Sequence, residues 1–217
     1  MANVKLSTSE LELVTDAHFI LTKNRIIAKV DRLFGMLAEA YSQEIKDKGI
    51  LPNEVLKISP KISKGENYEG LPWVMLDHPR YFTKEDVFAI RSFFWWGHFA
   101  SITLQLKGRY VERFRVEGLG LKAESERQNA KSRKPGSGGE RQDIGSEWFL
   151  CCNGTDEWQH HFGEDNYKLL SLFPLEELHR LPFIKLAKKI PLQEWDNMDI
   201  FFTAAFTEIM GMLSLTA

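Results

Sequence analysis

Polar residues that could hold an anionic ligand gather in residues 57–82, on both sides of the apolar stretch "WVML". The residues that could face a ligand there are Lys61, Lys64, Asn67, Tyr68 and Arg80. Lysines and backbone N–H groups in a glycine-containing loop can hold an anion, and an arginine can make a bidentate contact to a carboxylate or phosphate. The segment matches neither a P-loop nor a dinucleotide-binding fingerprint. The sequence therefore leaves two interpretations, an ordinary ordered loop or a ligand-facing loop at 61–82.

A lone histidine, His98, follows four consecutive aromatic residues and a glycine. A neutral imidazole at the mouth of an aromatic pocket could act as a general base or as a ligand. The alternative is a core histidine that begins a buried strand. Trp95 and Trp96 cannot both point the same way in regular structure, so we expect one in the core and one lining a surface groove. Asp77 is the second candidate for a general base.

The stretch "DEWQHHFGED" combines imidazoles with carboxylates, a set that suits zinc or iron. Its two histidines, His160 and His161, are adjacent on a predicted strand and would point to opposite faces. No H-E-x-x-H or C-x-x-C motif supplies a further ligand. The sequence therefore predicts no metal and no other cofactor, and leaves His160 and His161 as the residues to examine for one.

The two cysteines, Cys151 and Cys152, are also adjacent in sequence. Neighbours on a strand point apart, so they are poorly placed to bridge each other. In a buried strand a thiol stays protonated and unreactive, which argues against a nucleophile here. Reduced cysteines, and a first segment without the apolar core of a signal peptide, favour a cytoplasmic location.

Helices are expected to position these residues from both ends of the chain. Ser7 and Glu10 form a capping box that begins a helix over 6–21, and a longer helix is expected from Arg25 to Lys48 with Gly49 after its end. The break between the two is expected at "LTKN". The spacing of apolar residues also predicts helices at 83–94, in two short pieces over 174–190, and at 192–215.

Five strands are expected, at residues 72–77, 98–107, 147–153, 157–162 and 167–173. The clearest is 98–107, whose alternation puts His98 on the same face as Ile102 and Leu104. The dipeptide at 153–154, Asn-Gly, predicts a hairpin turn. Residues 122–146 are rich in charge, glycine and serine, which is typical of a long mobile loop or a disordered insertion.

The last predicted helix is apolar on nearly all sides from Ile200 onward. A helix of this kind is buried on most of its surface. It either passes through the core of its own chain or packs on a second copy, so a homodimer through 199–215 is one of two interpretations.

Composition limits the class of protein. The chain has 217 residues, with 28 Lys+Arg against 30 Asp+Glu and a net charge of −2. This balance argues against a general nucleic-acid binder, which needs a basic surface. No apolar run approaches the roughly 18 residues that cross a bilayer. We therefore expect a soluble protein with no membrane partner.

Together these patterns predict a single α+β domain over 1–217, with a mainly antiparallel sheet covered by N-terminal and C-terminal helices. The leading functional hypothesis is a non-enzymatic binding or interaction module, with a small anionic ligand against 61–82 and the aromatic residues 93–98. The alternative is a small enzyme acting on an anionic metabolite, in which Lys64 and Arg80 hold the anion and His98 or Asp77 is the general base. A binder of single-stranded nucleic acid fits the charge balance least.

Overall fold

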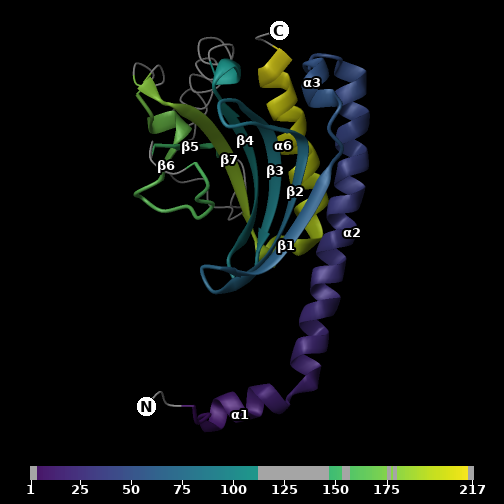
Figure 1. The fold of residues 1–217 in the computed structure, drawn as a ribbon, viewed down its shortest axis with the longest axis vertical. Coiled ribbons are helices and arrows are strands. Elements are labelled where there is room, and N and C mark those ends of the chain that lie inside the picture. Colours follow the sequence, from purple (N-terminus) through teal and green to yellow (C-terminus); the bar gives the residue numbers. More distant parts are fainter. Residues whose placement is uncertain (1–3, 112–146, 153–156, 175–176, 178–179, 215–217) are drawn as a thin grey trace, which may run out of the picture.

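The fold is a seven-stranded antiparallel sheet with two long helices on one of its faces (Figure 1). The computed structural model describes residues 4–111, 147–152, 157–174, 177 and 180–214. The strand order is β1-β2-β3-β4-β7-β5-β6. The strands are β1 (Lys61–Tyr68), β2 (Leu71–Phe82), β3 (Val87–Trp95), β4 (Phe99–Lys107), β5 (Phe149–Cys151), β6 (Tyr167–Leu169) and β7 (Phe183–Pro191). The predicted α+β class and antiparallel sheet are confirmed, but the expected number of five strands is too low.

The helices come from the two ends of the chain, as the sequence predicted. They are α1 (Thr8–Thr15), α2 (Ala17–Lys48), the short α3 (Asn53–Leu56) and α6 (Met198–Ser214), with 3-10 turns η1 (Leu170–Leu172) and η3 (Leu192–Asn197). Helices α2 and α6 pack against each other and against the sheet. In the described part of the chain no helix is long and apolar enough to cross a membrane.

Local capping chemistry sets the ends of α1 and α2. The predicted capping box is confirmed, because the backbone N–H of Glu10 donates to Ser7 Oγ (3.3 Å) and the backbone N–H of Ser7 donates to Glu10 Oε2 (2.7 Å). Gly49 ends α2 with a left-handed φ of 62°. The break between the helices lies at Asp16 rather than at "LTKN", because the Asp16 carboxylate accepts hydrogen bonds from the first N–H groups of α2.

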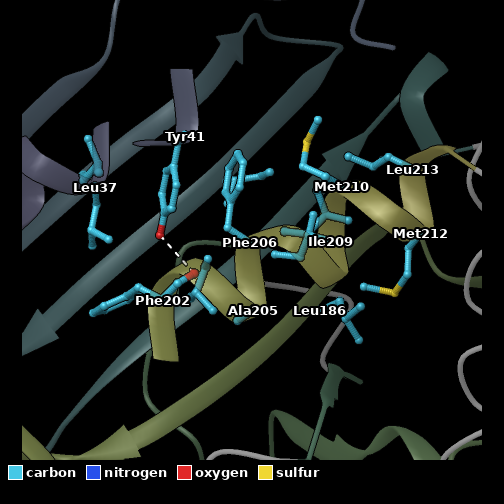
Figure 2. Packing of buried hydrophobic residues seen from close by; sticks show 14 of the residues in the cluster. Leu37, Tyr41, Leu186, Phe202, Ala205, Phe206, Ile209, Met210, Met212 and Leu213 are labelled. Atoms are coloured by element: carbon cyan, nitrogen blue, oxygen red, sulfur yellow. Dashed lines mark hydrogen bonds between the residues drawn. The ribbon is translucent and has the colours of Figure 1, made fainter. Parts of the chain in front are cut away.

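The main core lies between α2, α6 and the sheet. The ring of Tyr41 stacks on Phe206 with their centroids 3.8 Å apart, and its hydroxyl donates to the carbonyl oxygen of Phe202 (Figure 2). Phe34 meets Phe202 edge-on at 5.7 Å. Most of the apolar surface of α6 is therefore buried inside its own chain, as the first interpretation of this helix expected. The second interpretation, a homodimer through 199–215, stays a prediction.

Three segments predicted as loop or helix are strands. Residues 61–68, expected as part of a loop, form β1 and pair with β2, which contains the strand predicted at 72–77; 87–95 form β3 instead of a helix, and 183–191 form β7 instead of a short helix. Both faces of β3 and β7 are buried, so apolar residues occupy both faces and the alternation that marks a strand is hidden. Pro79 was expected to end the strand, but β2 continues through it. The register shifts between Asp77 and Arg80, and a proline, which has no N–H to donate, is tolerated at such an irregularity.

The remaining differences concern the region around β5. The predicted strand at 147–153 is shortened to β5, which pairs with β6 and β7, and 157–162 is not a strand. The predicted strand at 167–173 is shortened to β6, followed by η1. The predicted turn at 153–154 and the loop at 122–146 lie outside the described residues, as does part of the helical piece after residue 174.

Candidate functional site

The face of the sheet turned away from α2 and α6, here called the second face, carries charged and aromatic residues in place of an aliphatic layer. On β3 the residues Phe88, Ile90 and Phe94 belong to the main core, so the alternate residues Arg91 and Phe93 lie on the second face. By the same alternation, its polar residues on the neighbouring strands include Asp77, Gln105, Lys107, Lys185 and Lys189. Several of these are buried, so another segment must lie over them.

Residues 157–162, here called the cover segment, lie over the second face. Lys107 Nζ donates to Glu157 Oε1 (2.6 Å), and the hydroxyl of Tyr68 accepts from the backbone N–H groups of His160 (2.7 Å) and His161 (3.2 Å). The ring of Phe162 meets Phe99 edge-on at 5.1 Å. The cover segment is thus fixed at both ends by side chains that rise from the sheet.

Arg91 and Asp77 form an ion pair beneath the cover segment. Arg91 Nε donates to Asp77 Oδ1 (2.6 Å), and both residues are less than 10% exposed. Each of the rings of Phe82 and Trp158 lies 5.4 Å from the guanidinium carbon, and Arg91 Nη1 donates to Gln105 Oε1 (3.4 Å). Removing two charges from water is costly, so the pair depends on these close contacts.

Lys185 and His160 lie next to this pair. Lys185 is fully buried, its ammonium donates to the carbonyl oxygen of Gln159, and in the sheet it is the partner of Gln105. Burial holds the pKa of His160 well below its ordinary value, and the positive charges of Lys185 and Arg91 lower that pKa further. The imidazole is therefore neutral at pH 7. We call Arg91, His160 and Lys185 the basic cluster.

The residues predicted to bind a ligand are divided between the two sides of the sheet and its edge. Tyr68 and Trp95 lie on the second face, with their rings 5.2 Å apart at 78°. Trp96 contacts the main core on the helix side, where its ring lies 6.4 Å from Phe94. Trp95 is therefore buried and Trp96 half-buried.

The other predicted ligand residues lie on an edge strand or have partners of their own. Lys61 is exposed on β1, and Lys64 Nζ donates to Asp31 of α2 (2.8 Å). Asn67 accepts from the N–H of Gly70 in the hairpin turn, and Arg80 Nε donates to the carbonyl oxygen of Ser59 (2.9 Å). The segment expected as a loop is thus a hairpin, and only Tyr68 of this segment's predicted residues contacts the cover segment.

The alternation predicted that His98 begins a buried strand, and this prediction is wrong. His98 is exposed in the turn between β3 and β4, and its ring stacks on Trp95 at 3.6 Å. The backbone turns at Gly97, whose φ of 76° leaves the strand conformation one residue before His98. The rest of the predicted core face, Ala100 to Leu106 in alternate positions, is buried as expected.

Sequence reasoning missed Arg91 and Lys185, although it named Asp77 and His160. Both missed residues lie in segments predicted to be helical, where a charged residue is expected on the solvated side. The signal that could have found them is the enrichment of β-branched and aromatic residues around them, as in "AIRSFFW".

Two carboxylates lie near His161, whereas His160 contacts aromatic rings. His161 Nδ1 lies 3.3 Å from Glu69 and its Nε2 lies 3.8 Å from Asp165, while His160 packs on the rings of Tyr68 and Phe93. Among the described residues no three His, Cys, Asp or Glu side chains are placed to hold a metal ion. Neither Cys151 nor Cys152 is part of a disulfide.

The chemistry available on the second face is that of charge recognition. Arg91 and Lys185 supply fixed positive charge, and His160 can gain a proton when a negative charge arrives. Comparison of the chain with protein-family models, with curated proteins and with solved structures finds no match, so no relative assigns a role to these residues.

Proposed function

We propose that the chain is a non-enzymatic binding module for a small anion, which binds at the basic cluster, between the cover segment and the sheet. The observation that carries this proposal is the convergence of two buried cationic side chains of the second face, Arg91 and Lys185, on His160 of the cover segment. A core that served stability alone would be at least as stable with apolar residues of similar size in these places. Charged groups that remain buried in this way are typical of a binding site.

The charges of the second face favour an anion over a cation. Its described cationic side chains include Arg91, Lys107, Lys185 and Lys189, and the register adds Lys61 opposite Asp77 and Arg80 opposite Ala89. Asp77 and Glu157 are the carboxylates that pair with Arg91 and Lys107. An anion would take over the hydrogen bond that Lys185 gives to the carbonyl oxygen of Gln159. The cover segment has no regular secondary structure, so its shift would break no ladder of strand hydrogen bonds.

The enzymatic alternative has less support from the geometry. Lys64 points to α2 and Asp77 lies on the opposite face of the sheet, so one of the two anion-holding residues is separated from one of the two candidate bases. Arg80, the other anion-holding residue, donates to the carbonyl oxygen of Ser59, and the other candidate base, His98, stacks on Trp95 in the exposed turn between β3 and β4. Asp77 is also held by Arg91, which disfavours a role as a base. Of the residues that were expected to face a ligand at 61–82, the proposal retains Tyr68, whose hydroxyl holds the cover segment.

Sulfate is the first probe, because it keeps its charge across neutral pH. We expect isothermal titration calorimetry at constant ionic strength to show binding that weakens about tenfold or more in Lys185→Met, since a charge-assisted hydrogen bond contributes about 1.5–3 kcal/mol. Lys168→Met, at an exposed position on β6, removes the same charge outside the site and serves as the control. Equal sulfate affinity in both folded variants would refute the proposed site.

The pH dependence of binding is a second expected result. Because the pKa of His160 is held well below its ordinary value, an arriving anion raises that pKa and binding takes up a proton. Affinity for sulfate should therefore rise as the pH falls between two values, the pKa of His160 in the complex and the lower pKa of His160 in the free protein. The rise is at most about tenfold per pH unit. His160→Gln should bind with an affinity that no longer changes with pH. A pH dependence that survives in this variant would assign the proton to another group, such as His161.

A further inference from the structure

A cavity of about 310 Å³ is lined by α2, by η3 and by the start of α6. It lies on the helix side of the molecule, because α2 and α6 pack together on the face of the sheet opposite to the basic cluster (Figure 1). Cavities that bind small molecules in proteins have volumes of about 300–1,000 Å³. This one is at the small end of that range, which suits a metabolite.

The apolar part of the cavity is held in place by the main core. Leu33 of α2 and Trp195 of η3 both pack against that core, and the ring of Trp195 meets Phe94 edge-on at 6.3 Å. Met198, at the start of α6, is only 1% exposed. Met36 of α2 also lines the cavity and is 60% exposed. The cavity therefore has a fixed apolar wall that includes an indole ring, and it opens to solvent at Met36.

Charged residues of opposite sign lie on the two sides of the cavity. Lys29 and Arg32 lie on α2, whereas Asp196 lies on η3 and Asp199 on α6. All four residues are exposed. Within the described part of the chain none of these four side chains has an ion-pair partner. The basic side and the acidic side thus line one cavity without contacting each other, which leaves room for a ligand that contacts both.

We propose that this cavity binds a free α-amino acid with an apolar side chain. Its ammonium group lies on the side of Asp196 and Asp199, its carboxylate on the side of Lys29 and Arg32, and its side chain on Trp195. An α-amino acid carries both charges at neutral pH, so it complements both sides, whereas a ligand with a single charge would face one side of its own sign. An apolar side chain would also remove the apolar wall from water. The proposed anion site lies on the second face of the sheet, so this site does not depend on it.

Phenylalanine and two of its derivatives test the proposal on the full chain. N-acetylphenylalanine lacks the ammonium group, and phenylalaninamide lacks the carboxylate. In ¹⁵N–¹H NMR spectra we expect the indole N–H signal of Trp195, identified by its loss in Trp195→Phe, to shift as L-phenylalanine is added in the millimolar range. Each derivative should bind about fivefold more weakly, because it loses its ion contacts with one side of a partly exposed site.

Two variants assign each charge of the ligand to one side of the cavity. In Asp196→Asn/Asp199→Asn, phenylalanine should bind no better than N-acetylphenylalanine, because the carboxylates that prefer the ammonium group are gone. In Lys29→Gln/Arg32→Gln, phenylalanine should bind no better than phenylalaninamide, because the cations that prefer the carboxylate are gone. If both variants discriminated among the three compounds as the wild type does, the proposed site would be wrong.

Two controls separate this cavity from the rest of the molecule. Lys46→Gln/Lys57→Gln removes two positive charges at exposed positions outside the cavity and should keep the preferences of the wild type. Lys185→Met, which is expected to weaken sulfate binding, should leave the affinity for phenylalanine unchanged. A loss of that affinity in Lys185→Met would place phenylalanine at the basic cluster and overturn this inference, while the sulfate titration tests the anion site separately. An unmoved Trp195 signal, or equal binding of phenylalanine and both derivatives by the wild type, would overturn it as well.

Discussion

Replacing Arg91 with alanine is expected to lower the free energy of unfolding by about 3–5 kcal/mol, because the buried carboxylate of Asp77 then loses its counter-charge. The side chain of Asp77 is 9% exposed, so water cannot fully replace the guanidinium. The rings of Phe82 and Trp158 also lose the planar group that lies against them. Urea denaturation followed by tryptophan fluorescence measures the loss, with the slope of the transition checked for two-state behaviour.

Two further variants separate the cost of an unpaired charge from the loss of packing. Asp77→Leu/Arg91→Met replaces both charges with apolar groups and should regain most of the lost stability. Lys64→Ala removes an exposed ion pair with Asp31 and should change stability by no more than about 1 kcal/mol. If Arg91→Ala cost no more than Lys64→Ala, the pair would not be buried in solution as it is in the structure.

The same pair shows why sequence reasoning identified only part of the site. Its carboxylate was named, because Asp77 follows an apolar strand that is apparent from the sequence. Its partner Arg91 lies in a segment predicted as a helix, because Val87, Phe88 and Ile90 fit a helical spacing as well as a buried strand. Fourteen residues separate the two along the chain, and only the β2–β3 register brings them together.

Features that depend on a few neighbouring residues were predicted well. The capping box of Ser7 and Glu10 and the left-handed Gly49 follow from side-chain and backbone chemistry within one helical turn. Burial on both faces of a strand depends on what the rest of the chain places there, so β3 and β7 were missed. His98 was also missed: alternation along the strand predicted that it is buried, but the chain turns at Gly97 and leaves it exposed.

The second large effect is expected at Phe206, in the core between α2 and α6. Phe206→Ala should lower the free energy of unfolding by about 3–5 kcal/mol, because the side chain is fully buried and its removal leaves a cavity. The ring also stacks on Tyr41 at 3.8 Å, and an aromatic pair contributes about 0.5–1.5 kcal/mol beyond its buried area. Chemical denaturation at two protein concentrations is the appropriate measurement, since the result also bears on the role of α6.

Ile200→Ala is the matched control, because Ile200 lies on the same helix but is 66% exposed. If α6 serves only the core of its own chain, Ile200→Ala should leave stability nearly unchanged, and the loss in Phe206→Ala should be the same at both protein concentrations. If residues 199–215 also join two copies, Ile200→Ala should destabilise the protein more at the higher concentration, where more of it is dimeric. A small loss in Phe206→Ala at every concentration would contradict the packing of α6 between α2 and the sheet, and with it the division of the sheet into a helix-covered core and a second face that carries the basic cluster.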